Sequence, residues 1–221
     1  MLSIRNISKS YPGRGPVLSE LNLEVGPGDS VAITGPSGSG KTTLMNIIGL
    51  LDRPDSGEII FMNRSVLELS NDEAALYRNR NIGFVFQEHL LLPYLTILEN
   101  IVLPLNASRL SDAEHQEKYE YGLDLMKKTG ITDLSRKYPY QVSGGEAQRA
   151  TVVRALVNKP SLLLADEPTG SLDQKNATIL GDMLRDLNLE LGIALILATH
   201  SPELADKMSM HLKLADGILV S

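Results

Sequence analysis

A glycine-rich segment near the start of the chain restricts the possible folds more than any other feature. Residues 35–42 read Gly-Pro-Ser-Gly-Ser-Gly-Lys-Thr and match the pattern G-x-x-x-x-G-K-[ST]. A short β-rich run, Ser30–Thr34, precedes this segment, and residues 42–51 follow it with a helical pattern. A strand, a glycine-rich turn and a helix in this order predict a loop whose backbone N–H groups surround phosphate at the start of the helix.

Individual residues of this segment have predicted roles. Lys41 is expected to reach the β- and γ-phosphates of a nucleotide, and the Thr42 hydroxyl is expected to bind Mg²⁺. The other predicted nucleotide contacts are Gly35, Ser37, Gly38, Ser39, Gly40 and Thr43. A loop that only turns a strand into a helix would not need this pattern in this setting, so we favour phosphate binding.

A second segment supplies two carboxylates at the end of an apolar run. Residues 161–167 read Ser-Leu-Leu-Leu-Ala-Asp-Glu, as expected for a strand that is buried on both faces. Side chains alternate along a strand, so Asp166 and Glu167 are expected to point in different directions. We predict that Asp166 holds Mg²⁺ and that Glu167 polarises the attacking water as a general base.

The order of these motifs resembles that of the ATP-binding subunits of ABC transporters, over essentially the whole chain. Residues 142–146, Val-Ser-Gly-Gly-Glu, resemble the signature segment of that family and open a predicted helix. The resemblance implies that Ser143 and Gly145 grip the γ-phosphate of an ATP held by a second subunit. It therefore implies a head-to-tail dimer with two ATP molecules at its interface. Taken alone, Ser-Gly-Gly-Glu is also a common helix cap.

Four further residues match the family at single positions. Gln87 resembles the glutamine that contacts Mg²⁺ and the attacking water, and His200 resembles the histidine near the γ-phosphate. Asp173, in Ser171-Leu-Asp, resembles the loop that crosses the dimer interface, and Tyr11 resembles the aromatic that stacks on adenine. Judged alone, the first three are more often surface residues, and Tyr11 is also explained as an aromatic packed on an edge strand.

The chain as a whole predicts an α/β fold. We expect one ATP-binding domain over 1–221, with a P-loop NTPase core built from a mixed sheet and flanking helices. An N-terminal antiparallel β part is expected to belong to this core, which takes residues 1–87 and 158–221. Residues 88–157 are assigned to an inserted α-helical subdomain that carries the signature segment.

Local patterns predict the individual elements. Capping-box spacings at Thr96/Glu99 and Ser111/Glu114 predict helices over about 96–107 and 111–129. Alternation around Asp216-Gly217 predicts a terminal hairpin. The expected strands lie around 21–25, 30–34, 57–62, 82–86, 162–165 and 193–198.

Composition narrows the possible partners. The 221-residue chain has 21 Lys and Arg against 27 Asp and Glu, a formal net charge of −6, which does not favour a nucleic-acid partner. It has no cysteine, which excludes a disulfide framework and a thiolate zinc site. No apolar stretch approaches the ~20 residues that span a bilayer, and the first residues lack a signal-peptide pattern. With the resemblance, we expect a peripheral protein on the cytoplasmic face of the bacterial inner membrane.

The resemblance narrows to the bacterial group of the lipoprotein-releasing LolD, macrolide-exporting MacB and cell-division FtsE ATPases. It rests on residues 50–58, 91–105 and 165–170, and it implies ATP and Mg²⁺ as cofactors and a membrane permease as partner. Val142, Glu146 and Ser171 depart from the residues that are commoner in the family or in this group. The expected function is ATP hydrolysis that powers a permease.

A permease is expected to dock near residues 87–99, a loop that contains many large apolar side chains. Local packing between two lobes is the alternative explanation for these side chains. An FtsE-like regulatory ATPase, a soluble ATPase acting on DNA or ribosomes, and a P-loop kinase are the alternative functions. Cargo, transport direction, the permease and the choice between homodimer and heterodimer are not decided by the residues.

Overall fold

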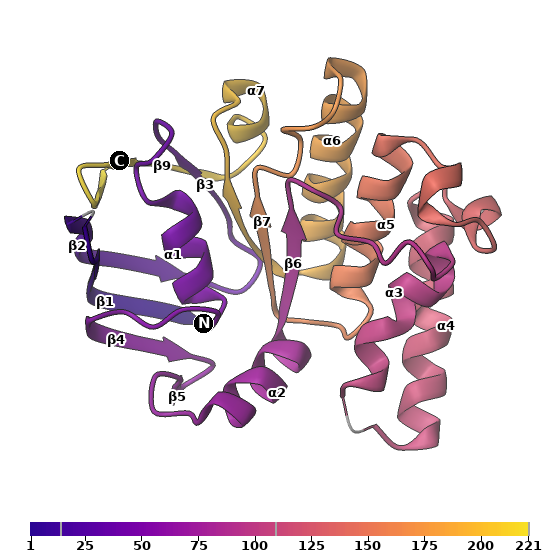
Figure 1. Ribbon diagram of the computed structural model, residues 1–221, viewed down its shortest axis with the longest axis horizontal. Helices are drawn as coiled ribbons and strands as arrows, with labels where there is room; N and C mark the ends of the chain where they lie inside the picture. Colours follow the sequence, from indigo (N-terminus) through magenta and orange to yellow (C-terminus); the bar gives the residue numbers. More distant parts are fainter. Residues whose placement is uncertain (14, 109, 221) are drawn as a thin grey trace.

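Two β-sheets organise the computed structural model, which describes residues 1–13, 15–108 and 110–220 (Figure 1). In this part of the chain a six-stranded sheet has the order β10-β9-β3-β8-β7-β6, and a four-stranded sheet has the order β2-β1-β4-β5. The strands are β1 (Leu2–Tyr11), β2 (Gly15–Val25), β3 (Ser30–Thr34), β4 (Ser56–Phe61), β5 (Arg64–Ser65), β6 (Ile82–Phe86), β7 (Leu162–Asp166), β8 (Ala194–Ala198), β9 (Met210–Ala215) and β10 (Ile218–Val220).

Helices cover both faces of the larger sheet. The helices are α1 (Lys41–Ile48), α2 (Asn71–Asn81), α3 (Ile97–Asn106), α4 (Asp112–Lys128), α5 (Gly144–Leu156), α6 (Gln174–Leu191) and α7 (Pro202–Ala205), with 3-10 turns η1 (Thr132–Leu134) and η2 (Pro139–Gln141). Helix α1 lies between the two sheets, and α3, α4, α5 and α6 lie on the other side of the larger one (Figure 1). None of the helices in the described ranges is both long and apolar enough to cross a membrane.

The central strands are buried on both faces, which explains their continuous apolar sequences. Leu163 and Ala165 of β7 belong to the core that contains the α3–α6 side chains. Leu162 and Leu164 of the same strand belong to the core that contains α1 and the smaller sheet. Strands buried in this way are typical of parallel sheets with helices on both sides.

The parallel strands end at a common edge of the larger sheet. Phe86, Asp166 and Ala198 are in register across β6, β7 and β8, and Ala198 also pairs with Ile33 of β3. The loops that follow these four residues therefore start side by side. Ligands of open α/β sheets bind at such an edge, beyond the carboxyl ends of the strands.

Most predicted elements are present, and their ends have local causes. Thr96 and Ser111 cap α3 and α4 with complete capping boxes, as predicted. Helix α1 ends before residue 51, the predicted end, since Leu50 adopts a left-handed conformation with φ 57°. The predicted terminal hairpin forms, with Ala215 paired to Ile218. Helix α2, which opens with the same kind of capping box, has no counterpart among the expected elements.

Candidate nucleotide-binding site

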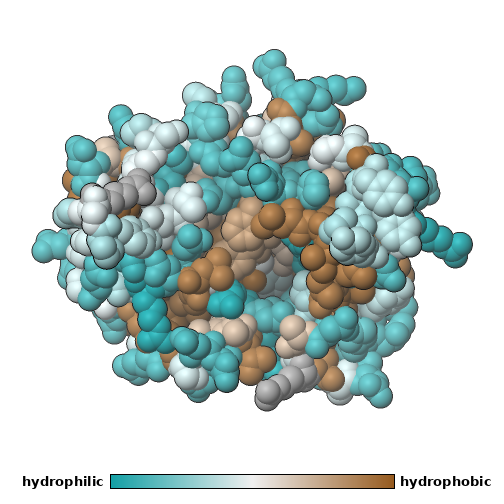
Figure 2. All heavy atoms as spheres, viewed as in Figure 1, coloured by the Kyte–Doolittle hydropathy of each residue, from teal (hydrophilic) through white to brown (hydrophobic). Residues whose placement is uncertain are grey.

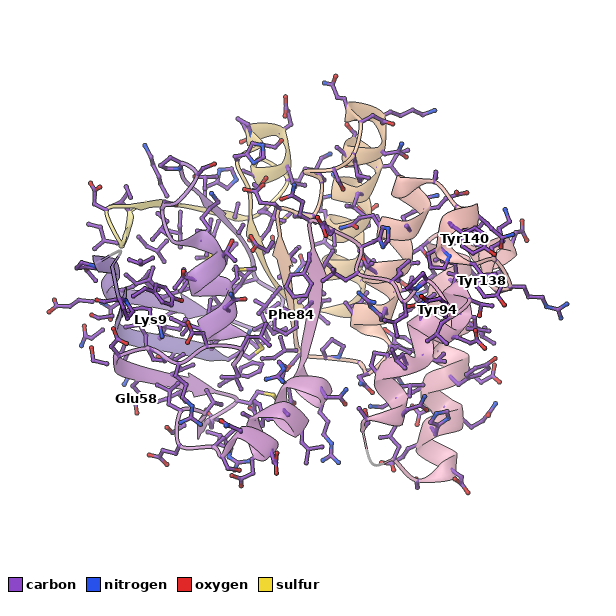
Figure 3. The ribbon with its side chains drawn as sticks, viewed as in Figure 1. Lys9, Glu58, Phe84, Tyr94, Tyr138 and Tyr140 are labelled. Carbon is purple, nitrogen blue, oxygen red and sulfur yellow. The ribbon has the colours of Figure 1, made fainter. Side chains whose placement is uncertain are left out.

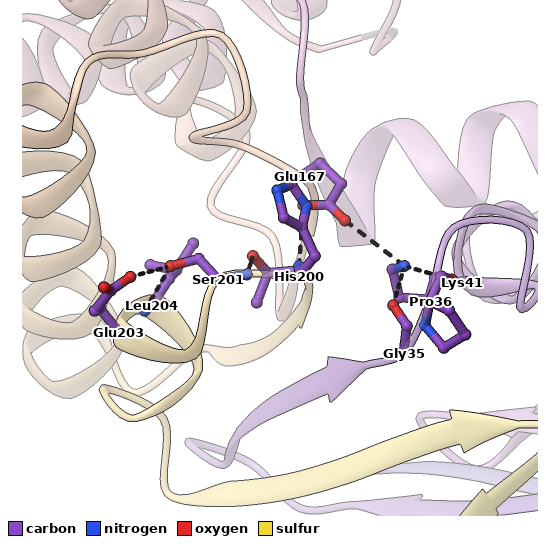
Figure 4. A network of polar contacts seen from close by, with 9 residues as sticks. Gly35, Pro36, Lys41, Glu167, His200, Ser201, Glu203 and Leu204 are labelled. Atoms are coloured by element: carbon purple, nitrogen blue, oxygen red, sulfur yellow. Dashed lines mark hydrogen bonds and ion pairs between the residues drawn. The ribbon is translucent and has the colours of Figure 1, made fainter.

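The glycine-rich loop between β3 and α1 closes around the Lys41 side chain. The Lys41 ammonium donates hydrogen bonds to the carbonyl oxygens of Gly35 at 2.8 Å and Pro36 at 3.3 Å (Figure 4). Lys41 is only 7% exposed. The loop therefore holds a buried positive charge at the start of α1, as an anion site requires.

Two positions in this loop have no room for a side chain. A Cβ atom on Gly35 would lie 2.5 Å from the Leu214 carbonyl oxygen, and one on Gly40 would lie 3.0 Å from a methyl of Val17. Gly40 also has φ 107°, a conformation that L side chains rarely adopt. Nearby, the Ser39 hydroxyl is buried and has no hydrogen-bond partner among the residues that the structure describes. A bound phosphate could satisfy that hydroxyl.

Asp166 ends β7 beside the same loop. Its Oδ1 atom is buried without a hydrogen-bond partner in the described part of the chain. Burial raises the pKa of the Asp166 carboxyl, while a hydrogen bond from the Thr42 hydroxyl opposes the rise. An unpaired carboxylate oxygen beside a threonine hydroxyl is a donor set that fits Mg²⁺, which binds few protein oxygens and keeps several waters.

Glu167 connects the phosphate loop with His200. Its Oε1 atom lies 3.7 Å from Lys41 Nζ, and its Oε2 atom lies 2.8 Å from His200 Nδ1 (Figure 4). Oε2 also accepts the His200 backbone N–H at 3.3 Å. The Glu167 backbone has φ 48°, an uncommon value for a residue with a side chain, and such strain is concentrated at functional sites.

Gln87 lies directly after β6, at the same edge of the sheet. Together with Thr42, Asp166 and Glu167 it lines a pocket of about 250 Å³. Its side chain packs against Gly170, where an added Cβ atom would lie 3.0 Å from the Gln87 amide. Residues predicted from three separate segments therefore meet around one small pocket.

The predicted signature segment lies elsewhere in the molecule. Ser143 caps α5, and its hydroxyl accepts the Glu146 backbone N–H at 3.3 Å. The Glu146 carboxylate accepts the Ser143 N–H at 2.7 Å and the Ser143 hydroxyl at 2.8 Å. Helices α5 and α1 lie on opposite sides of β6 and β7 (Figure 1). Ser143 and Gly145 are therefore not brought to the phosphate loop of their own chain.

Comparison with known proteins agrees with this arrangement. A model of the family described as ABC transporter matches residues 18–170. The chain is 44% identical to the lipoprotein-releasing system ATP-binding protein LolD 1 of Rhodopirellula baltica, over 100% of this chain and 96% of that protein. The chain belongs to the ABC transporter family.

Two other relatives extend the comparison. The chain is 43% identical to the macrolide export ATP-binding/permease protein MacB of Syntrophobacter fumaroxidans, over 99% of this chain but 31% of that protein. The solved ATP-binding cassette MJ0796, a dimer in a post-hydrolysis state bound to ADP and Pi, superposes with a TM-score of 0.87. It is 36% identical and covers 100% of this chain and 97% of that chain. The expected fold, a mixed sheet with an antiparallel β part and helices, is thereby confirmed.

Asp173 is the N-cap residue of α6, and both of its carboxylate oxygens accept hydrogen bonds from the first turn of that helix. One carboxylate oxygen accepts the Asn176 backbone N–H at 2.8 Å, and the other accepts the Asn176 side-chain amide at 2.8 Å. These hydrogen bonds lower the pKa of Asp173. The same Asn176 lies against Gly145, where an added Cβ atom would be 2.5 Å from its Oδ1. Asp173 thus stands next to the signature segment as a helix cap, and its nucleotide role stays a prediction.

Tyr11 packs on the core of the smaller sheet, but β1 is not an edge strand as the alternative explanation expected, because it pairs with β2 on one side and β4 on the other. Its hydroxyl donates to the Asp52 carboxylate at 2.6 Å, and its ring lies 5.0 Å from Lys9 Nζ. Lys9 also donates to Asp52, at 2.9 Å. A hydrogen bond with Thr43 connects the tyrosine hydroxyl with α1. Lys9 and Asp52 were not singled out in the sequence, since only the fold brings them to Tyr11.

Proposed function

We propose that this chain is the ATP-hydrolysing subunit of an ABC transporter of the lipoprotein-release or macrolide-export type. One observation carries the proposal. A buried Lys41, an unpaired Asp166 oxygen and a Glu167 carboxylate bound to His200 meet at one sheet edge. The named relatives act in lipoprotein release and macrolide export, which supports the transport class.

The phosphate loop has the groups needed to bind ATP. Lys41 exchanges its bonds with loop carbonyls for bonds with the β- and γ-phosphates, and the helix dipole of α1 adds to this attraction. The other loop contacts are Gly35, Ser37, Gly38, Ser39, Gly40 and Thr43, and Tyr11 stacks on the adenine ring. Thr42, Asp166 and Gln87 would hold Mg²⁺, which supplies positive charge to the phosphate oxygens.

Glu167 acts on the attacking water. Its carboxylate lies between Lys41 of the phosphate loop and His200, so it would hold a water for in-line attack on the γ-phosphate. Glu167 accepts a proton from this water as a general base. His200 orients the Glu167 carboxylate and donates to the transferred phosphoryl group, and Gln87 orients the water.

A second copy of the chain completes each site. Ser143 and Gly144 are exposed and Gly145 is buried beneath them, on the side of β6 and β7 away from their own phosphate loop. The Ser143 hydroxyl and the Gly145 backbone would therefore serve the ATP of the partner. Asp173 lies beside the signature segment and would cross the same interface. The solved cassette MJ0796 is a dimer, which supports a dimeric assembly for this chain.

The permease docks on an apolar hollow between the two lobes. Figure 2 shows hydrophobic side chains around a hollow in the middle of the displayed face. A pocket of about 450 Å³ there includes Leu51, Phe84 and Pro104, and in Figure 3 Phe84 lies on β6 near the centre of the molecule. Segment 87–99 runs beside it and exposes Leu90, Leu92 and Tyr94 by 55%, 46% and 89%. Packing between lobes does not explain these three exposed side chains.

Docking of the permease on this hollow would couple ATP binding and hydrolysis to movement of the permease. We assign residues 88–157 to a helical body that moves with the permease relative to the core of 1–87 and 158–221. We place the chain at the cytoplasmic face of the bacterial inner membrane, beside a permease like the one that the name of the MacB relative includes. Closure of the dimer on ATP and its opening after phosphate release would drive this movement.

Gel filtration and phosphate release of Glu167→Gln test the proposal together. With Mg-ATP this variant is expected to shift from monomer to dimer and to hydrolyse no ATP, since binding is retained and the base is lost. Arg185→Met, a change of a half-exposed arginine on α6, is the control and should hydrolyse ATP like wild type. Near-normal hydrolysis by Glu167→Gln would exclude Glu167 as the base.

A further inference from the structure

The loop that follows β6 is held through its carbonyl oxygens by side chains from distant segments. Gln148 Nε2 donates to the Phe86 carbonyl at 2.7 Å, and Ser171 Oγ donates to the Gln87 carbonyl at 3.1 Å. Arg154 donates to the His89 and Leu90 carbonyls at 3.0 and 2.8 Å. These four bonds fix the backbone on both sides of Gln87.

Two of these side chains belong to the helix that the signature segment opens. Gln148 lies in the second turn of α5 and is 1% exposed, so its amide has no access to water as a substitute partner. Arg154 lies in the last turn of α5, and its planar guanidinium bonds two successive carbonyls at once. An α-helix is a stiff element, so a displacement at Ser143 would also move both side chains.

The third side chain belongs to the loop before α6. Ser171 is exposed and stands two residues before Asp173, which caps α6 next to Gly145. The signature segment and this loop are the two regions that the proposed dimer presents to the partner. Ser171 therefore bonds the Gln87 backbone directly from this surface, and helix α5 connects the signature segment, through Gln148 and Arg154, to the backbone on both sides of Gln87.

We propose that Gln148, Arg154 and Ser171 are positioning residues that set the place of Gln87 in its own pocket according to the nucleotide of the partner subunit. This inference rests on the proposed function, in which Gln87 orients the attacking water. A shift of α5 upon contact with the partner's ATP displaces the carbonyls of Phe86, His89 and Leu90, and Gln87 moves with them. The same backbone continues into segment 87–99, where the permease is proposed to dock, so the displacement of Gln87 is transmitted to the permease.

A double-mutant cycle with Gln87→Ala tests this inference, because it separates action through Gln87 from a general loss of packing. The single variants are Gln148→Met, which keeps the side-chain length without the amide donor, Arg154→Lys and Ser171→Ala. In the wild-type background we expect kcat to fall about tenfold for Gln148→Met and Arg154→Lys and about threefold for Ser171→Ala, because small misplacements at a reacting centre are costly. The KM for ATP should change less than about twofold, since the phosphate loop is untouched.

In the Gln87→Ala background the same changes should lower kcat by less than about twofold, since the residue through which they act is gone. Ser171→Thr, which keeps the hydroxyl, should restore kcat to the wild-type value. Arg185→Lys and Thr178→Ala are matched controls on the exposed surface of α6 and should leave kcat unchanged. Thermal unfolding identifies any variant that is not folded, and the exposed Ser171 keeps the test available if Gln148→Met unfolds.

Equal decreases of kcat in both backgrounds, or no decrease in the wild-type background, would overturn the positioning role. If Glu167→Gln abolishes hydrolysis while the cycles are additive, only this inference fails. If Glu167→Gln retains hydrolysis, the proposed catalytic site itself fails.

Discussion

The starts of α1 and α5 both consist of serine and glycine residues, yet their backbone amides are used differently. The N-cap residue of α1 is Gly40, which has φ 107° and provides no side-chain cap, and the first turn of α1 contains no acidic residue. The N-cap residue of α5 is Ser143, and the Ser143–Glu146 capping box bonds the free backbone groups at this helix start. The first helix start is open to a phosphate, and the second is satisfied within its own chain.

This difference indicates that the two helix starts differ in how strongly they bind phosphate. A helix start whose amides lack partners binds an anion strongly, since the anion satisfies them and meets the positive end of the dipole. A capped helix start already has these bonds, so it adds a weaker contact. We therefore expect the phosphate loop to hold ATP in the monomer, and the signature segment to act only when two subunits meet.

The largest effect is expected at Lys41. Lys41→Ala removes the buried charge of the open helix start, and we expect kcat/KM for ATP to fall at least about 100-fold, as for other lost charge-stabilising groups. Phosphate release and equilibrium ATP binding measure this effect. Lys128→Ala, a change of an exposed lysine paired with Glu190, is the control and should behave like wild type. Activity of Lys41→Ala within twofold of wild type would contradict the comparison.

Ser143→Ala is expected to lower kcat about tenfold and to leave ATP binding by the monomer unchanged. The loss of the cap should also lower the free energy of unfolding by about 1 kcal/mol. Phosphate release, ATP binding and thermal unfolding measure the three quantities.

Mixing Ser143→Ala with Lys41→Ala tests the head-to-tail dimer directly. Each mixed dimer has one intact site, formed by the Lys41 of one subunit and the Ser143 of the other. Random pairing should restore about one quarter of wild-type hydrolysis, since about half of the dimers are mixed and each has one of two sites. No recovery after subunit exchange would exclude a site shared in this way.

Glu146→Gln should have a smaller effect on hydrolysis and a distinct effect on pH dependence. Glutamine keeps the capping box but removes a negative charge beside the partner's phosphate, so ATP-driven dimerisation should strengthen about two- to fivefold, as for loss of a partly screened like charge. Hydrogen bonds from Ser143 hold the pKa of Glu146 below its ordinary value of 4.5. The stability that the charged box adds is therefore present above pH 4.5 and is lost as pH falls through the lowered pKa.

Thermal unfolding between pH 3 and 7 compares the two proteins. The wild-type protein should lose this contribution at the acidic end of the range, and Glu146→Gln should not. Identical slopes of stability against pH would contradict the assignment.

The smallest expected effect is a difference in stability between substitutions of two adjacent glycines of α5. Gly145→Ala would bring a Cβ atom to 2.5 Å from Asn176 Oδ1, so we expect a loss of about 1–3 kcal/mol, as for other overpacked sites. Gly144→Ala meets only a methyl of Leu172 at 3.8 Å and should be neutral or stabilising by less than about 1 kcal/mol. Denaturant unfolding of both variants measures the difference, and equal stabilities would contradict the packing argument.

The sequence was sufficient where a function depends on a short contiguous segment. Gly35, Gly40 and Lys41 are recognisable because the bend of the loop and the charge within it are encoded by neighbouring residues. The buried strand before Asp166 and the capping boxes of α3 and α4 were predictable for the same reason. Each depends on periodicity or on a hydrogen bond that spans three residues.

Only the tertiary structure decided which of these segments meet. His200 bonds Glu167 from 33 residues away, Gln148 holds the Phe86 carbonyl from 62 residues away, and Asp52 holds the Tyr11 hydroxyl from 41 residues away. It also decided that Ser143 faces away from the phosphate loop of its own chain. Such contacts depend on strand register and on which sheet face each helix covers. Those are set by packing of the whole chain, and no local pattern contains them.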